Sequence, residues 1–422
     1  MSEHGLFEVF IRLDALKEIP IKNEDVFKAY FNEDIYFFGT VGKLILYDKY
    51  GLKEYGPVTG DEKIMITYGR DSANVKEFSL VRISKISGVS QFKQSRTAVL
   101  ELHFVDSFFL NMVTRKFSRA WQGQKRGSEI VKDILEKMVG LENQTIEIEQ
   151  SATSFENFYM PYWTPAETIR WISDRSIGTK GKSNYGYLLY PSSKKLLNFI
   201  TLDNLLNNAQ VDSDPYLLET TDLNYLNKVL SWQITGVDQM GIKELGGGRL
   251  LGYDHSEKKI LGLEKNDQFI YSEAVKKISA LGQSSLFDGS TIDNKSDIFN
   301  YTYENTGESD PTILKNMFYN NFIRRYSLQN MVKFLVTGHN RRYAGQKIVV
   351  NWPSVSDDDI FSSMDSGQYL IKSVVHTFSP LQTPIYLQTL TCIKNAYQTN
   401  KFNTTTGIVN SILGNFKLGI FG

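Results

Sequence analysis

The segment most like a ligand-binding motif is Gly178-Thr-Lys-Gly-Lys-Ser183, which shares its glycines, lysine and hydroxyl with phosphate-binding loops. A P-loop also requires a glycine five positions before its second glycine, and Ser176 stands there. It needs a helix after the loop, so that free N–H groups at the helix N-terminus face the anion. Here helical periodicity precedes the loop and a strand-like run, Tyr185–Tyr190, follows it. This order predicts an exposed helix-to-strand loop instead of a phosphate site.

Four further features could carry chemistry, and each has a simpler structural interpretation. Gly246-Gly247-Gly248 lacks the G-x-G-x-x-G spacing of dinucleotide-binding proteins. Asp357-Asp358-Asp359 lacks the glycine and terminal glutamate of a calcium loop. His376 lies in a strand-like run, where we expect a structural histidine whose hydrogen bonds are satisfied. Cys392 is the single cysteine, which excludes an internal disulfide and a multi-cysteine metal site. We therefore expect neither a cofactor nor a metal ion.

Pairs of acidic or basic residues could act as catalytic or binding groups. A glycoside hydrolase needs two carboxylates at a fixed separation, one of them with a raised pKa. Glu156 and Asp174 are candidates, but nothing distinguishes them among the 47 acidic residues. The basic pairs Arg324-Arg325 and Arg341-Arg342 are too short to indicate nucleic-acid recognition. No catalytic constellation emerges, so we expect a protein that is not an enzyme.

The composition is that of an ordinary globular protein. Of the 422 residues, 41% are hydrophobic and 22% are charged, and 47 Lys+Arg balance 47 Asp+Glu. The zero net charge disfavours a protein whose main task is to bind nucleic acid or an anionic membrane, because such binding needs excess lysine and arginine. The N-terminal MSEHGLFEVFIRLD lacks a signal-peptide pattern, and no run approaches the roughly 20 apolar residues of a membrane-spanning helix. We expect folding and assembly in a cytoplasm and no membrane partner.

The order of the elements predicts an α+β, mainly β protein, and the length indicates about three domains at roughly 150 residues each. Residues 1–122 are rich in strand-like runs, of which the first alternates Phe7, Val9 and Ile11 with other residues. Residues 123–225 combine helical and strand-like patterns, which indicates a mixed α/β domain.

Two helices are marked in the middle region. Ser128 is placed to cap the first helix, and Gly140 follows its last apolar residue as a C-terminal stop. Thr164-Pro165-Ala166-Glu167 forms a capping box with proline at the first helical position. Trp171 contributes to the apolar face of this second helix.

Strand-like runs return in residues 226–394, interrupted by a polar insertion near 253–311. Within this insertion we expect a helix around Glu273–Leu281. Residues 395–422 form a C-terminal tail that starts polar and ends apolar. The apolar side chains of the tail either dock on a partner protein or fold back onto their own subunit. The candidate docking residues are Ile412, Leu413, Phe416 and Phe421.

Three segments of the chain resemble the central baseplate hub proteins of contractile-tailed bacteriophages, a family related to late control protein D and to the base of type VI secretion VgrG spikes. Arg115–Leu135 is similar to the family's strand that leads into a capped helix. Phe155–Arg175 is similar to its aromatic- and proline-containing segment before an amphipathic helix. Val332–Ile393 resembles the strands that close its second barrel. The family-like positions are Ser128, Pro161, Trp163, Pro165, Glu167, Trp171, Gly338, Gly345 and His376.

The resemblance implies two tube-like antiparallel β-barrel domains, residues 1–122 and 226–394, around the inserted α/β domain of residues 123–225. Hubs of this family are homotrimers, so six barrels would form a pseudo-six-fold ring that joins the tail tube to the central spike. The implied partners are further copies of the chain, the tail tube protein, the spike protein, the tape measure protein and the baseplate wedge proteins. DNA would pass through the lumen without specific binding, in the tail baseplate of a virion.

Two other functions remain open at this point. One is a tail-associated cell-wall hydrolase. The other is a carbohydrate- or receptor-binding tail module, which the 13% aromatic content would suit.

Overall fold

The structure is a computed structural model that describes residues 6–14, 17–48, 62–70, 73–86, 98–180, 184–218, 220, 225–235, 249–254, 258–262, 303–305, 310–326, 331–353, 366–380 and 385–394. The fold is mainly antiparallel β-structure with several helices, which confirms the expected α+β, mainly β class. Within these ranges no helix is long and apolar enough to cross a membrane.

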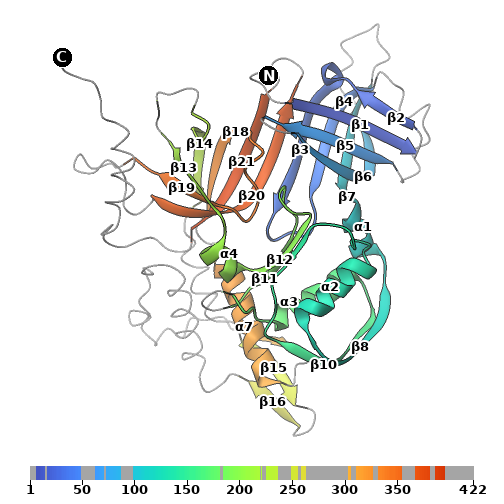
Figure 1. The fold of residues 1–422 in the computed structure, drawn as a ribbon, viewed down its shortest axis with the longest axis vertical. Coiled ribbons are helices and arrows are strands. Elements are labelled where there is room, and N and C mark those ends of the chain that lie inside the picture. The colour runs from blue at the N-terminus through green and yellow to red at the C-terminus, as the bar shows by residue number, and fades with distance from the viewer. Residues whose placement is uncertain are drawn as a thin grey trace, which may run out of the picture.

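A 13-stranded sheet dominates the fold (Figure 1). Its N-terminal half contains η1 (Asn23–Asp25) as a connecting turn and the strands β1 (Leu6–Asp14), β2 (Lys17–Ile21), β3 (Val26–Asp34), β4 (Val41–Asp48), β5 (Lys63–Gly69), β6 (Asn74–Ile86) and β7 (Ala98–Asp106). Its C-terminal half contains β13 (Val211–Leu217), β14 (Val229–Thr235), β18 (Met331–Thr337), β19 (Lys347–Asn351), β20 (Gly367–Ser379) and β21 (Ile385–Ile393).

The long strand β20 joins the two halves into one sheet. Its first residues, Gly367–Leu370, pair with β19, and its later residues, Ser373–Phe378, pair with β3 on the same side. β21 pairs with β20 on the opposite side along most of the strand. Among the described strands the path of paired strands runs from β14 at one end to β2 at the other and does not close, while an isolated bridge joins Leu217 of β13 to Lys228, directly before β14.

Each half of the sheet has its own apolar core, built from alternate residues of its strands. In the N-terminal half the buried cluster includes Phe31, Leu44 and Phe104. In the C-terminal half it includes Phe334 and Cys392, and the latter is a buried free thiol, as expected. These two cores fix which face of each strand is inside.

The residues between the two halves form a separate α/β layer, below the large sheet in Figure 1. A two-stranded sheet pairs β10 with β8, and a three-stranded sheet has the order β11-β12-β9. The elements are α1 (Ser107–Thr114), β8 (Phe117–Arg126), α2 (Gly127–Lys137), β9 (Ile146–Ile148), β10 (Ser154–Trp163), α3 (Pro165–Arg175), β11 (Tyr187–Tyr190), β12 (Leu197–Thr201) and α4 (Leu202–Asn208). The sequence did not predict α1.

The capping box of α3 is confirmed. The Thr164 hydroxyl accepts a hydrogen bond from the Glu167 N–H at 3.2 Å, and the Glu167 carboxylate accepts one from the Thr164 N–H at 2.8 Å. The prediction that Ser128 caps α2 is wrong. The helix starts earlier, with Arg126 as its N-cap residue, and Ser128 is instead buried inside the first turn. There its hydroxyl accepts from the Ser151 N–H at 3.0 Å, a partner far along the chain.

The polar insertion contributes β15 (Arg249–Asp254), β16 (Lys259–Gly262) and β17 (Tyr303–Asn305), which form a small sheet, followed by α7 (Pro311–Tyr326). Helix α7 was not predicted. Its buried Asn320 donates to the carbonyl oxygens of Asp174 at 2.7 Å and Ser176 at 3.0 Å, at the end of α3. The helix expected around Glu273–Leu281 and the tail of residues 395–422 lie outside the described residues.

Candidate functional site

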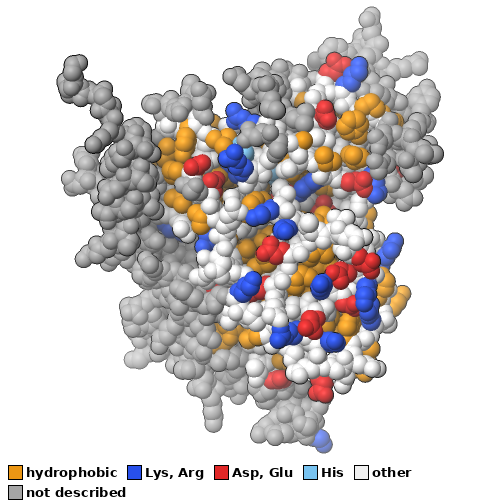
Figure 2. All heavy atoms as spheres, viewed as in Figure 1, with side chains coloured by type: hydrophobic (Ala, Val, Ile, Leu, Met, Phe, Trp, Pro, Cys, Tyr) orange, Lys and Arg blue, Asp and Glu red, His pale blue; other side chains and the backbone are white. Residues whose placement is uncertain are grey.

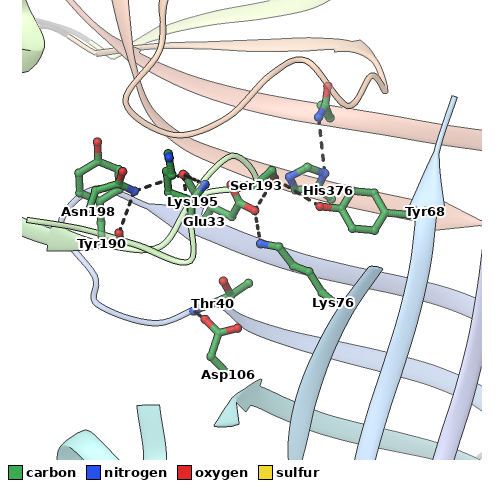
Figure 3. A network of polar contacts seen from close by, with 12 residues as sticks. Glu33, Thr40, Tyr68, Lys76, Asp106, Tyr190, Ser193, Lys195, Asn198 and His376 are labelled. Atoms are coloured by element: carbon green, nitrogen blue, oxygen red, sulfur yellow. Dashed lines mark hydrogen bonds and ion pairs between the residues drawn. The ribbon is translucent and has the colours of Figure 1, made fainter. Parts of the chain in front are cut away.

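A buried polar cluster lies where the two halves of the sheet meet the inserted layer (Figure 3). We call it the junction, and it is formed by Glu33, Lys76, Ser193, His376 and Tyr386. The carboxylate of Glu33, on β3, accepts hydrogen bonds from the Ser193 N–H at 3.0 Å and the Ser193 hydroxyl at 2.6 Å. Ser193 belongs to the turn between β11 and β12, so one carboxylate connects the sheet to the inserted layer.

The charge of Glu33 is balanced inside the protein. Glu33 is fully buried and forms an ion pair with Lys76 on β6. Burial raises the pKa of Glu33, but Lys76, His376 and Ser193 outweigh it and the pKa is lowered overall. Burial likewise opposes the charge of Lys76, yet the adjacent Glu33 carboxylate raises the pKa of Lys76 overall. Both groups are therefore ionised, and each is the reason the other can stay charged.

His376, on β20, brings the C-terminal half to the same cluster. Its ring stacks on Phe31 with ring centroids 4.4 Å apart, and its Nδ1 lies 2.8 Å from the Tyr386 hydroxyl. The Tyr386 hydroxyl accepts from the Gln388 amide at 3.1 Å, which leaves its own hydrogen for Nδ1. Burial lowers the pKa of His376 to about 4, so the ring is neutral at pH 7. His376 is thus buried and hydrogen-bonded through Nδ1, as expected for a structural histidine, whereas its Nε2 has no hydrogen-bond partner.

Two glycines predicted from the family-like pattern allow close approaches near the junction. Gly338, directly after β18, donates its N–H to the Tyr386 carbonyl at 2.8 Å, and a Cβ there would overlap the Tyr386 ring. Gly345 has φ +89°, and a Cβ there would lie 2.5 Å from the Tyr190 hydroxyl. Gly338 and His376 are thus brought together around Tyr386. Gly345 lies where the C-terminal half meets β11.

The other family-like residues lie apart from the junction, in the inserted layer. Trp171 on α3 packs against Phe155 and Phe158 of β10, with ring centroids 5.4 and 5.2 Å apart. Trp163 packs at the side of the same core, whereas Pro161 is exposed. Pro165 and Glu167 belong to the first turn of α3, whereas Ser128 connects α2 to Ser151, as described above. These residues have structural roles within the layer.

Arg342 is an important residue that the sequence did not single out as buried. It is almost fully buried, and its guanidinium donates to the Tyr216 hydroxyl at 2.7 Å and the Gln388 side-chain carbonyl at 3.0 Å. It also donates to the Asn227 side-chain carbonyl at 2.8 Å. Because Gln388 contacts Tyr386, the polar network continues from the junction into the C-terminal half. Nothing in the sequence around Arg341-Arg342 indicates that Arg342 is buried and hydrogen-bonded in this way.

The carboxylates considered for catalysis do not form a pair. Glu156 is exposed on β10, while Asp174 forms an ion pair with Arg324 of α7. Arg324 also donates to the Tyr187 carbonyl at 2.7 Å, so it holds α7 against the inserted layer. Among the residues that the structure describes, no group of three or more His, Cys, Asp or Glu could hold a metal ion. Asp174 and Arg324 thus connect α3, α7 and β11 and do not form a catalytic pair.

The P-loop-like segment borders a polar cavity of about 510 Å³ between the inserted layer and the C-terminal half. Lys180 and Lys194 line it, together with Tyr343 from the loop before β19. The Gln210 side-chain carbonyl accepts from Lys194 at 2.8 Å and from the Tyr343 hydroxyl at 3.1 Å. These polar groups bind one another across the cavity, so they tie the two parts together as the junction does.

Comparison with known proteins identifies the fold. No protein-family model matches the chain, and no curated protein matches its sequence. The structure is similar to the tail protein of Neisseria meningitidis MC58, with a TM-score of 0.56, 9% identity, and 92% of this chain and 96% of that chain covered. It is also similar to the 43 kDa tail protein of prophage MuSo2 from Shewanella oneidensis, with a TM-score of 0.54, 11% identity, and 92% and 98% covered. The chain therefore has, over almost its whole length, the fold of these tail proteins.

Proposed function

We propose that the protein is a structural component of a bacteriophage tail and acts as the central hub of its baseplate. The shared fold with two tail proteins, over 92% of the chain in each case, supports this role. The junction supports it as well, because its buried ion pair and hydrogen bonds connect the two sheet halves and the inserted layer. A part that transmits force between a tube and a spike needs such fixed internal geometry.

The observation that carries the proposal is the continuity of β20. Because this strand pairs with both β19 and β3, the two β-halves of one chain lie side by side in a fixed orientation. On our proposal each half acts as one tube-like barrel. These halves are close to the expected domains of residues 1–122 and 226–394, except that α1 and β8 belong to the inserted layer and β13 (Val211–Leu217) to the C-terminal half. Three chains would then present six similar units around a three-fold axis. Such a ring matches a three-fold spike to a six-fold tube.

The proposed partners follow from this geometry. One face of the ring would meet the tail tube and the tape measure protein, and the other the central spike, with wedge proteins outside. DNA would pass through the lumen without specific binding, in a baseplate assembled in the host cytoplasm. The balance of 47 basic and 47 acidic residues is compatible with a conduit, because a strongly basic lining would retain DNA.

The proposal includes no catalytic step. A buried carboxylate with a lowered pKa, such as Glu33, cannot serve as a general acid, which needs a raised one. The junction therefore has the electrostatics of a structural contact. Electron microscopy of the purified full chain, alone and bound to its spike, tests the proposal. Hollow particles with three-fold symmetry are expected, and single-chain particles in both samples would refute it.

A further inference from the structure

The strand β14 has an exposed row of apolar side chains that continues a core. Leu230, Trp232 and Ile234 are 49%, 51% and 45% exposed. Trp232 and Ile234 are two residues apart and share one face, whereas Leu230 lies at a register shift between Val229 and Ser231. Trp232 is paired with Phe334 and Ile234 with Val332 across β18, and both partners are buried in the core of the C-terminal half. Trp232 and Ile234 therefore lie on the inner face of the sheet, at a place where the apolar core is exposed to solvent.

The space-filling view agrees with this placement. Hydrophobic side chains gather over β13 and β14 on the face shown in Figure 2. Within the core, the Trp232 ring makes an edge contact with Trp352, with ring centroids 5.0 Å apart, while Trp352 itself is buried. The Trp232 side chain thus contacts the core but remains about half exposed, and another apolar segment could cover its exposed surface.

β14 is also at an edge of the sheet. It ends the strand order, and among the described residues its ladder partner is β18 alone. Soluble proteins usually protect such edges with charged residues or proline. The sequence of β14, Val-Leu-Ser-Trp-Gln-Ile-Thr, contains neither. An extra strand beside β14 would pair the backbone groups that have no ladder partner among the described residues, beyond the isolated Leu217–Lys228 bridge directly before β14, and would cover its apolar row.

The end of the last described strand lies close to this edge. Ile393 of β21 pairs with Met331 of β18, which pairs with Thr235 of β14, so the three residues form one row across the sheet. At about 4.8 Å between neighbouring strands, residue 393 lies about 10 Å from residue 235. The tail of residues 395–422 therefore begins two strands away from the open edge.

The strand directions suit a return of the tail along β14. Both β21 and β14 are antiparallel to β18, so they run in the same direction. A segment that turns back after β21 would run antiparallel to β14, starting at its Thr235 end. The 394–416 stretch can span far more than the distance required, at about 3.3 Å per extended residue. The extra cost of closing this long loop is small.

The tail contains a segment that matches β14 in its period. Phe416, Leu418 and Ile420 alternate with Lys417 and Gly419. This is the two-residue period of a strand with one apolar face. We propose that residues 416–420 of the same chain add an antiparallel strand to the free edge of β14 and complete the core of the C-terminal half.

Trp232 and Ile234, whose face is fixed by their pairing with β18, define one register. Leu418 stands opposite Trp232, which places Phe416 opposite Ile234 and brings Ile420 to the register shift at Leu230. In this arrangement both inner-face pairs form together, and a shift by one residue would bring Lys417 or Gly419 against the core. The tether favours the tail of the same chain over that of another, because a linked segment has a high effective concentration.

Hydrogen exchange in the full chain tests the proposal. The β14 amides that point away from β18 are expected to exchange at least about tenfold more slowly in the full chain than in a variant lacking residues 408–422. Leu418→Asp should speed their exchange as the deletion does. Lys417→Asp, on the opposite face of the same segment, should not. Equal exchange of these amides in the full chain and the deletion variant would overturn the proposal.

A cysteine pair tests the register and the origin of the strand. Residues directly opposite each other in an antiparallel pair are close enough for a disulfide. Ile234→Cys with Phe416→Cys should form an intrachain disulfide on mild oxidation, and Ile234→Cys with Lys417→Cys should not, because residue 417 faces away. Native Cys392 can stay, since it is fully buried. A disulfide between two chains would overturn the proposal in favour of a second copy's tail.

This inference does not depend on the proposed function. The β14 edge and its exposed row are properties of one chain, and they can be tested in a monomer. A protected β14 in a chain that never forms trimers would support the tail strand and refute the hub. An unprotected β14 in a hollow three-fold particle would do the reverse.

Discussion

The carboxylate of Glu33 accepts two hydrogen bonds from Ser193, at 3.0 Å from the backbone N–H and at 2.6 Å from the hydroxyl. The two residues are 160 positions apart and belong to different parts of the fold. A buried carboxylate is costly unless it is paired and hydrogen-bonded, and here the ion pair with Lys76 and the serine together meet that need. This contact is therefore one of those that fix the inserted layer to the sheet.

Glu33→Gln should lower the free energy of unfolding substantially. The variant leaves Lys76 buried without its counter-charge, and breaking a buried ion pair in this way costs roughly 3 kcal/mol or more. Denaturant unfolding of the purified chain measures the loss. Hydrogen exchange at the Ser193 turn should also become faster, because the turn loses its anionic acceptor.

Glu77→Gln is the matched control for Glu33→Gln. Glu77 pairs with Lys63 at 2.5 Å, but both side chains are over a third exposed. Removing such a pair costs at most about 1 kcal/mol. If the two variants lose equal amounts of stability, the junction does not have the role we assign to it.

The free energy of unfolding should fall as the pH decreases from about 6.5 to about 4, partly because of His376. Its pKa is lowered to about 4 in the folded protein, so the unfolded chain binds a proton in this window and the folded chain does not. The contribution is complete above pH 6.5 and is lost progressively towards pH 4, by up to ~3 kcal/mol. Urea titrations at several pH values measure it.

His376→Gln should flatten the pH dependence in this window. Glutamine can still contact the Tyr386 hydroxyl but does not titrate. Glu33 contributes in a different window, because its pKa is lowered below its usual 4.5 and its stabilisation is lost only at more acidic pH. An unchanged slope between pH 6.5 and 4.5 in His376→Gln would show that the histidine is not buried in its neutral form.

Gly345→Ala should destabilise the protein more than Gly123→Ala. Both glycines have positive φ, +89° and +71°, so alanine is strained by about 1–2 kcal/mol at either position. Only at Gly345 does the new Cβ meet a neighbour, the Tyr190 hydroxyl at 2.5 Å, whereas nothing lies within 4 Å of it at Gly123. Adding Tyr190→Phe to Gly345→Ala should restore part of the loss. Equal melting temperatures for the two alanine variants would contradict the close approach.

The local features of the fold could be predicted from the sequence. The α3 capping box depends on residues three apart, Thr164 and Glu167, and it formed as predicted. The alternation of Phe7, Val9 and Ile11 likewise identified a strand with one buried face. Ser128 shows the limit, because its hydroxyl has a choice of partners and takes the distant Ser151 N–H over its own helix.

The junction could not be predicted, because its residues have no local pattern. Glu33 sits in an alternating strand like any exposed acid, and only the folded chain brings Lys76 and Ser193 to it. Helix α7 was missed for a similar reason. It packs Met317, Tyr319 and Ile323 into an apolar cluster, and Asn320 and Arg324 bind carbonyl oxygens of the inserted layer, contacts that no local pattern marks. The sequence of β14 does not show which of its faces is the inner one, because that follows from its pairing with buried residues of β18.

The chain should not hydrolyse bacterial cell walls. Asp174 is held by Arg324, and Glu156 is exposed on another element, so these two carboxylates lack the arrangement of a glycosidase. Zymography with the purified full chain should show no clearing. Clearing that disappears in Glu156→Gln or Asp174→Asn would favour a tail-associated hydrolase over the hub.

The central claim, that three chains form the hub ring, is tested most directly by native mass spectrometry of the full chain, alone and co-expressed with its spike protein. The account predicts a species of three times the 48.2 kDa chain mass in at least one of the two samples. With the spike present, three copies of the chain should be retained in the complex. A mass of one chain in both samples would contradict the account.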